Sequence, residues 1–182
     1  MEGWNIVITV IPGPDNEPRL LHGLRRLGAF RRSHFKDVLI GHHPMDVAGF
    51  LSALKQAREA DEAWVRPLAR VIPVEHIFRF TADTLAQQFK QWAASVVSRM
   101  TGGSCFHVRL ERRGMEGLVD TPRVEREVAD QVFARAEELG KPLSVSFSDP
   151  DYIIAAETLG DECGVALLDR ELRHRFPFVQ PR

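Results

Sequence analysis

Short segments rich in β-branched residues alternate with helical segments, and this alternation is the strongest constraint on how the chain can fold. In the first 80 residues the predicted order is strand, helix, strand, strand, helix, strand. Leucines spaced as on one helical face predict the first helix, and Asp46 is a plausible N-cap for the second. The four extended segments are residues 4–11, 30–33, 35–41 and 68–80. A chain of this pattern must cover a sheet with helices.

This β-α-β-β-α-β order is that of a ferredoxin-like domain. The second half then begins a new series, with a helix capped by Thr81 and a strand in which Phe106, Val108 and Leu110 alternate with polar residues. A helix between Thr121 and Gly140 follows, and the remaining predicted strands are residues 143–147, 152–157 and 164–168. We therefore predict an α+β protein of two small domains, residues 1–80 and 81–182.

The charge balance limits the kinds of ligand that the chain can bind. Its 182 residues carry 24 Lys and Arg against 25 Asp and Glu, a formal net charge of −1. This balance excludes a protein that binds nucleic acid through bulk positive charge. If RNA is the ligand, a local basic surface must bind it, and we expect no binding to DNA or to a membrane.

Two cysteines, Cys105 and Cys163, lie far apart in the sequence and form no Cys-x-x-Cys pair. We expect two free thiols and a cytoplasmic protein, and a single disulfide is the alternative. The apolar run at residues 6–11 stops at Pro12 and is too short for a signal peptide or a membrane span.

Other candidate sites lack the residue spacing that their chemistry needs. The adjacent His42 and His43 would point to opposite faces of a strand, so we expect no metal site. Gly102 and Gly103 follow a helix rather than a strand, which favours a helix stop over a phosphate loop. The segment 149–152, Asp-Pro-Asp-Tyr, reads as a turn between strands. We accordingly expect no cofactor and no catalytic residues.

An arginine-rich strand end is the strongest candidate for binding. Strand alternation places Arg109 and Arg113 on the face opposite the apolar residues, with Arg112 at the strand end and Gly114 directly after it. Guanidinium groups suit bidentate contact with phosphate, and glycine permits close approach of the backbone. The alternative is a solvated sheet face on which arginines pair with neighbouring carboxylates. Arg170, in the basic segment 170–175, is the next candidate.

Three motifs in this order resemble a THUMP domain over about residues 81–175. They are Phe-x-Val-Arg-x-x-Arg-Arg-Gly at 106–114, Phe-Ser-Asp-Pro-Asp-Tyr-Ile-Ile-Ala-Ala-Glu at 147–157, and Gly-Val-Ala-Leu-Leu-Asp-Arg at 164–170. The resemblance implies a THUMP domain preceded by a ferredoxin-like module. It also implies tRNA binding at the acceptor stem and its 3′ end, with Arg109, Arg112, Arg113, Gly114 and Arg170 as the matching positions.

The whole chain is most similar to stand-alone THUMP proteins, including the adaptors of a tRNA acetyltransferase that makes N4-acetylcytidine. The resemblance thus implies a non-catalytic protein that presents tRNA to a separate RNA-modifying enzyme. Two alternatives remain open, a protein–protein adaptor with little affinity for RNA and a small enzyme that acts alone. Glu111, Glu116 and Asp120 lie near the arginines, which limits long-range attraction of RNA.

Overall fold

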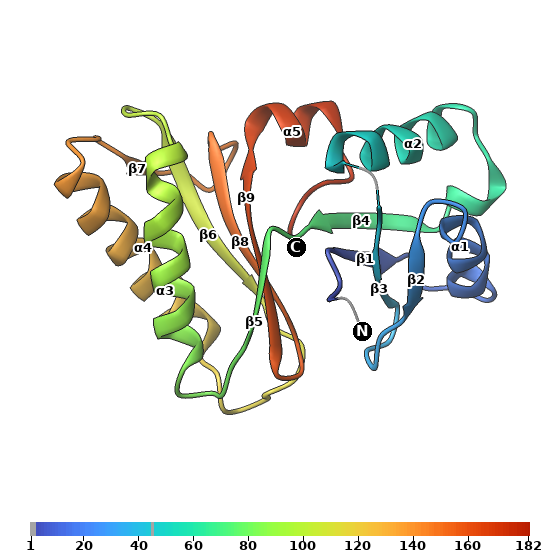
Figure 1. Cartoon of the computed structure of the whole chain (residues 1–182), viewed down its shortest axis with the longest axis horizontal. Helices are drawn as coiled ribbons and strands as arrows, with labels where there is room; N and C mark the ends of the chain where they lie inside the picture. The colour runs from blue at the N-terminus through green and yellow to red at the C-terminus, as the bar shows by residue number, and fades with distance from the viewer. Residues whose placement is uncertain (1–2, 45) are drawn as a thin grey trace. The chain divides into compact units, whose positions relative to one another are not determined.

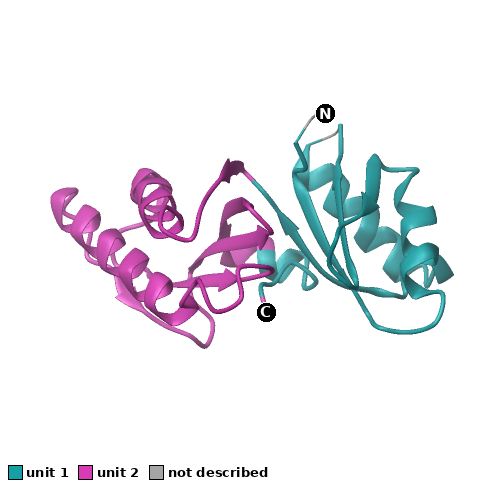
Figure 2. Ribbon diagram, turned by 90° about the horizontal axis from the view of Figure 1, so that it is seen from below, with its two compact units in different colours: residues 1–74, 173–181 teal, residues 75–172, 182 magenta. Residues whose placement is uncertain are grey.

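The computed structural model describes residues 3–44 and 46–182, which fold into two compact units. Unit 1 comprises residues 1–74 and 173–181, and unit 2 comprises residues 75–172 and residue 182 (Figure 2). One sheet has four strands and the other has five, and helices accompany both. This architecture confirms the predicted α+β class.

Unit 1 has the order of strands and helices that the sequence predicts. Its elements are β1 (Ile6–Val10), α1 (Asn16–Leu24), β2 (Ala29–Arg32), β3 (Val38–His42), α2 (Val47–Glu59), the 3-10 turn η1 (Ala63–Val65) and β4 (Leu68–Pro73). The strand order is β2-β3-β1-β4, and all neighbouring strands are antiparallel (Figure 1). Helix α1 therefore connects β1 to β2, with β3 between them in the sheet, and α2 connects β3 to β4, with β1 between them.

Strand β1 organises unit 1 because it pairs on both sides. Ile8 lies opposite Leu39 of β3 and opposite Val71 of β4, and all three side chains are fully buried. The β-branched run of β1 suits a strand covered on both faces. Helix α2 begins as predicted, since the Asp46 carboxylate accepts a hydrogen bond of 2.7 Å from the Gly49 backbone N–H.

Residues 173–181 belong to unit 1, whereas the sequence analysis placed them in the second domain. The Val71 N–H donates a 2.9 Å hydrogen bond to the Phe178 carbonyl, and the Arg58 guanidinium lies 5.4 Å from the centre of the Phe178 ring. Phe176, Phe178 and Val179 are buried. The burial of these three apolar residues holds the segment 173–181 in unit 1.

The predicted strand 68–80 is instead two strands in two different sheets. Strand β4 ends at Pro73, and β5 (His76–Arg79) pairs with a strand of the second sheet. The Glu75 N–H already donates to the Val165 carbonyl at 2.9 Å. The units thus divide between residues 74 and 75, six residues before the predicted boundary at 80. An apolar run cannot reveal which sheet each half of it joins.

Unit 2 contains the second sheet and two long helices. Its elements are β5, α3 (Leu85–Val96), the 3-10 turn η2 (Val97–Arg99), β6 (Cys105–Glu111), α4 (Thr121–Glu138), β7 (Ser144–Val145), β8 (Tyr152–Leu159) and β9 (Glu162–Asp169), and α5 (Arg170–Arg175) follows. The strand order is β5-β9-β8-β6-β7. Strand β6 is parallel to both of its neighbours, and the other pairs are antiparallel. Helices α3 and α4 lie on one side of this sheet (Figure 1).

The core of unit 2 lies between these helices and the sheet. Helix α4 buries Val124, Val128, Val132 and Ala136, the predicted apolar face, whereas Leu139 is exposed. Helix caps differ from the prediction: α3 begins after Thr84 rather than Thr81, and the Asp120 carboxylate, not Thr121, caps α4 by accepting from the Arg123 N–H at 3.2 Å. The predicted strand 143–147 is reduced to the two residues of β7.

We expect the substitution Gly41→Ala to destabilise unit 1. A Cβ atom at Gly41 would overlap the Phe30 ring and lie 2.7 Å from the Ala29 carbonyl oxygen, a backbone atom that cannot turn away. Overpacking of this kind costs about 2 kcal/mol of unfolding free energy. Urea denaturation followed by tryptophan fluorescence measures the loss. Gly102→Ala is the matched control, because its nearest neighbour would lie at 3.6 Å, and equal shifts in the two variants would contradict the expectation.

Candidate functional site

Strand β6, between β8 and the short edge strand β7, carries Arg109, and Arg112 and Arg113 directly follow its end. Phe106, Val108 and Leu110 are buried and belong to the helix-covered core, as predicted. His107, Arg109 and Glu111 alternate with them and are half-buried. Pairing with β8 places Arg109 opposite Ala155 and Glu111 opposite Glu157. The polar face of β6 is thus where alternation predicts it, and the contacts of each side chain decide what it can bind.

Arg113 forms a buried ion pair. Its guanidinium Nη1 lies 2.5 Å from Oε2 of Glu157, and the two side chains are only 11% and 3% exposed. The Arg113 backbone N–H also donates to the Thr158 hydroxyl at 2.8 Å. Arg113 therefore pairs with a carboxylate, as the alternative had it, but in a buried position rather than on a solvated sheet face. A phosphate could reach it only by displacing Glu157.

Arg112 and Gly114 shape the loop that follows β6. The Arg112 Nη1 donates to the Gly114 carbonyl at 2.5 Å and lies 3.4 Å from a carboxylate oxygen of Glu116. Gly114 has a φ of 88° and Met115 a φ of 58°, so two successive residues are left-handed, a conformation that glycine adopts at little cost. The Arg112 side chain remains 26% exposed. Of the predicted arginines at this strand end, Arg112 is the more accessible.

Arg109 lies within β6 itself. Its Nε donates to the carbonyl oxygen of Arg182, and the Arg182 guanidinium lies 3.6 Å from Glu111. Arg182 therefore contacts both Arg109 and Glu111 on the polar face of β6.

Arg170 lies at the other end of the sheet from Arg112. Its Nη1 is 2.8 Å from Asp151, its Nε is 3.2 Å from Asp149, and its Nη2 donates to the Asp149 carbonyl. Asp151 in turn accepts a 2.8 Å hydrogen bond from the backbone N–H of Cys105, the first residue of β6. The seven residues of β6 thus separate the two predicted groups by on the order of 20 Å. The structure brings Arg112, Arg113 and Gly114 together and leaves Arg170 apart.

An exposed aromatic ring lies two residues before Asp149, the partner of Arg170, and the sequence analysis did not select it as a site. Phe147 is 79% exposed, and its ring stacks on His107 with centroids 5.6 Å apart and planes inclined by 21°. The His107 Nδ1 lies 3.1 Å from the Ser146 carbonyl. Stacking on His107 orients the Phe147 ring and leaves much of it open to solvent. The position of Phe147 directly before the Ser-Asp-Pro-Asp turn could have indicated an exposed ring. The sequence analysis instead placed Phe147 in the predicted strand 143–147.

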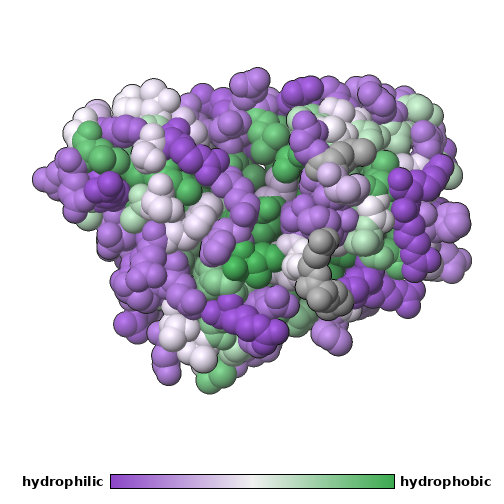
Figure 3. Space-filling model, viewed as in Figure 1, coloured by the Kyte–Doolittle hydropathy of each residue, from purple (hydrophilic) through white to green (hydrophobic). Residues whose placement is uncertain are grey.

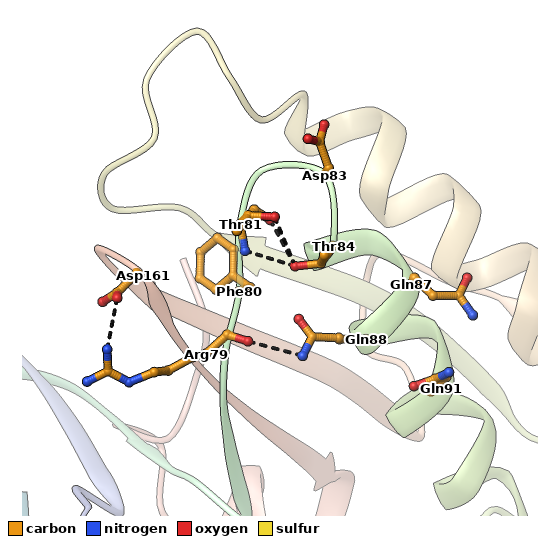
Figure 4. A pocket seen from close by; sticks show the side chains of 9 residues that line it. All are labelled: Arg79, Phe80, Thr81, Asp83, Thr84, Gln87, Gln88, Gln91 and Asp161. Carbon is orange, nitrogen blue, oxygen red and sulfur yellow. Dashed lines mark hydrogen bonds and ion pairs between the residues drawn. The ribbon is translucent and has the colours of Figure 1, made fainter.

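A hollow of about 830 Å³ opens beside the start of α3 (Figure 4). Its floor includes Phe80, and the Gln88 amide donates to the Arg79 carbonyl at 3.0 Å. Arg79 is paired with Asp161 at 3.2 Å, and Asp83 adds a second carboxylate to the lining. One guanidinium against two carboxylates gives the hollow no attraction for a polyanion.

Neither a metal-binding cluster nor a membrane-spanning helix occurs within residues 3–44 and 46–182. In these ranges no three His, Cys, Asp or Glu side chains converge as metal ligands would. No helix in the same ranges is both long and apolar enough to cross a bilayer.

Comparison with known families matches residues 77–168 to the THUMP domain, which is half of the chain and nearly all of unit 2. The chain belongs to the THUMP family. The match runs from β5 to β9 and includes the loop after β6, the Phe147 ring and the Ser-Asp-Pro-Asp turn, and it confirms the resemblance to a THUMP domain.

Solved structures of similar fold are longer than this THUMP protein. TrmN from Thermus thermophilus has a TM-score of 0.61 at 15% identity over 94% of this chain and 48% of its own. PH1313 from Pyrococcus horikoshii has 0.60 at 10% identity, over 90% and 53%. A 4-thiouridine synthetase in complex with RNA and ATP has 0.58 at 13%, over 91% and 41%. The chain thus spans about half of these proteins or less, and none of the curated proteins compared matches it.

We expect Glu157→Gln to destabilise the THUMP unit strongly. The substitution keeps the shape of the side chain but removes the nearer of the two carboxylates around the buried Arg113 guanidinium, leaving only Glu111 at 4.0 Å. Removing one partner of a buried pair costs about 3 kcal/mol or more of unfolding free energy, against less than about 1 kcal/mol for an exposed pair. Glu138→Gln, in the exposed pair with Arg135, is the control. Comparable urea midpoints for the two variants would show that the buried pair is not structural.

We expect the two thiols to differ in reactivity. Burial, with a smaller contribution from the charge of Glu157, raises the pKa of the fully buried Cys163 thiol well above its usual range, whereas Cys105 is half-buried. Cys163 should therefore react with a thiol reagent only on unfolding, and the Cys105→Ser variant should lose the fast phase. Above the unfolded-chain pKa of about 8.5 only the unfolded protein ionises at Cys163, so stability should fall as pH rises further. Rapid labelling of Cys163 in the native Cys105→Ser variant would contradict this.

Proposed function

We propose that this THUMP protein binds tRNA and presents it to a separate enzyme that modifies it. Its family match and its fold support a role in tRNA modification, because TrmN and the 4-thiouridine synthetase–RNA complex have similar folds. In this proposal unit 1 acts as the ferredoxin-like module before the THUMP domain, and the protein works in the cytoplasm. A tRNA acetyltransferase that forms N4-acetylcytidine is the proposed partner enzyme.

The exposed Phe147 ring is the observation that carries the binding proposal. Unpaired bases stack on exposed aromatic side chains without regard to sequence, and each such contact contributes about 1–3 kcal/mol to binding. Phe147 is already oriented by its stacking on His107, so little side-chain order must be gained when a base arrives. We propose that an unpaired nucleotide of the tRNA 3′ end stacks on this ring.

Arg112 remains the proposed phosphate contact at the other end of the sheet, since its guanidinium is partly exposed. Arg109 and Arg170 would have a structural role, because each donates to a backbone carbonyl, of Arg182 and of Asp149 respectively. Arg113 would act only by holding the loop after β6 through its ion pair with Glu157. In this proposal Arg112 binds RNA, and the other predicted arginines stabilise the protein surface on which RNA binds.

The principal alternative is a protein–protein adaptor that has little affinity for RNA. The observation in its favour is that Arg113 and Arg170 are both neutralised by carboxylates of the same unit. Retention of tRNA on a filter at low salt separates the two hypotheses, because the adaptor alone would retain none.

Phe147→Ala should weaken tRNA binding about tenfold, since an alanine side chain offers no ring on which a base can stack. Leu118→Ala is the control: this side chain is also apolar and 68% exposed in the same unit, but it is not aromatic. Filter binding at several salt concentrations gives both affinities. Equal affinity of the Phe147 variant and wild type would exclude this ring as the binding site.

The presenting role is tested by the nucleoside composition of bulk tRNA. Purified protein with acetyl-CoA or S-adenosylmethionine should leave the composition unchanged, and addition of the partner acetyltransferase should produce the modified nucleoside. A new nucleoside formed by the purified protein alone would overturn the non-catalytic proposal.

A further inference from the structure

Unit 1 carries a concentration of positive charge that the family match does not cover. Between residues 18 and 36 the chain has five arginines, one lysine and no acidic residue, although the whole protein has a net charge of −1. All six side chains are exposed: Arg19, Arg25, Arg26, Arg31, Arg32 and Lys36. In Figure 3 hydrophilic side chains prevail on the side of unit 1 where Figure 1 places α1 and β2. Such a local excess attracts a polyanion even when the total charge does not.

Three of these arginines surround one hollow. Its volume is about 490 Å³, and its lining consists of Arg25, Arg31, Arg32, Pro18 and Leu21. Arg25 directly follows α1, and the other two arginines lie on β2, the edge strand of the sheet. Within residues 3–44 and 46–182, no carboxylate lines the hollow.

The charge of the hollow is only partly balanced. Arg32 pairs through its Nε with Glu17, and Arg31 Nη1 donates to the Arg32 carbonyl at 3.4 Å. Among the described residues, no carboxylate forms an ion pair with Arg25 or Arg31. Arg25 could serve simply as the favourable positive charge at a helix C-terminus. The strand arginines have no such role, and a helix charge does not explain why three guanidinium groups converge.

The chemistry of the cluster indicates a phosphate backbone. Guanidinium groups bind phosphate in bidentate fashion, and five of the six basic residues are arginine. Within residues 18–36 no phenylalanine ring is exposed, since Phe30 is buried and Phe35 is half-buried, and the Trp64 ring beside Arg26 is half-buried as well. The cluster therefore offers unpaired bases no open ring like that of Phe147, whereas the phosphates of a double helix need none. The apolar lining, Pro18 and the buried Leu21, offers no anchor that could insert into a membrane.

We propose that Arg25, Arg31 and Arg32 form a phosphate-binding site for the backbone of double-helical RNA. The inference rests on the proposed function, because it takes RNA as the ligand, but it concerns a different unit and a different part of the RNA. This site would hold a paired stem through its phosphates, and the Phe147 ring would bind an unpaired nucleotide.

The test uses a blunt-ended RNA duplex and the same duplex with an unpaired 3′ tail, each labelled for fluorescence anisotropy with the full-length protein. The double variant Arg25→Gln/Arg31→Gln should bind the blunt duplex about tenfold more weakly at low salt. The slope of log affinity against log salt concentration should fall by about two, one for each phosphate that the variant no longer neutralises. Arg66→Gln/Arg135→Gln changes the net charge equally, but its arginines are in exposed ion pairs with Asp61 and Glu138, and it should bind like wild type.

Several results would overturn the proposal. One is an unchanged duplex affinity and salt slope in the double variant, and another is an equal loss in the control. Displacement of the duplex by polyglutamate of equal charge would make the cluster a site for acidic protein.

The two proposals can fail separately. If wild type binds the tailed duplex through Phe147 but not the blunt duplex, the arginine site is wrong and the proposed function stands. If the double variant loses blunt-duplex binding while Phe147→Ala binds the tailed RNA normally, the arginine site stands and the Phe147 site is wrong.

Discussion

The parallel pairing of β6 with β8 is the constraint on which the THUMP unit depends. A parallel pair cannot be closed by a tight turn, so a crossover that contains α4 joins β6 to β8. At one end Asp151 accepts from the Cys105 N–H and pairs with Arg170. At the other end Arg113 pairs with Glu157. These contacts join the two ends of the β6–β8 pair, and the arginines that make them are engaged by carboxylates of the same unit.

This use of arginine changes how RNA binding can be understood in a protein with a net charge of −1. Much of the basic character of the THUMP motif is used inside unit 2, where it is balanced by carboxylates. The Phe147 ring is exposed there and the Arg112 side chain is partly exposed, and together they suit a local contact with an unpaired nucleotide. The unbalanced charge lies in unit 1, between α1 and β2. The proposed division is therefore between base stacking in one unit and phosphate attraction in the other.

Much of the fold could be predicted because apolar periodicity reflects burial directly. The alternation at Phe106, Val108 and Leu110 and the face of α4 both appear in the core. The predictions were wrong where one local sequence pattern is compatible with two different structures. The run from 68 to 80 is rich in Val, Ile and Phe along its whole length, yet it crosses from one sheet to the other at residues 74 and 75. Likewise, Asp120 and Thr121 are both polar residues that can cap a helix, and only the hydrogen bond from the Arg123 N–H identifies Asp120 as the N-cap of α4.

By itself the sequence determined the order of strands and helices, the buried faces and the THUMP motifs, because these depend on residues close together in the chain. Only the tertiary structure decided which charges are available. Glu157 is 44 positions from Arg113, and nothing in the spacing of either indicates their pairing. The open face of Phe147 depends in the same way on His107, which lies 40 positions earlier. A side chain's capacity to bind is set by its partners in space, and those partners lie beyond the reach of local patterns.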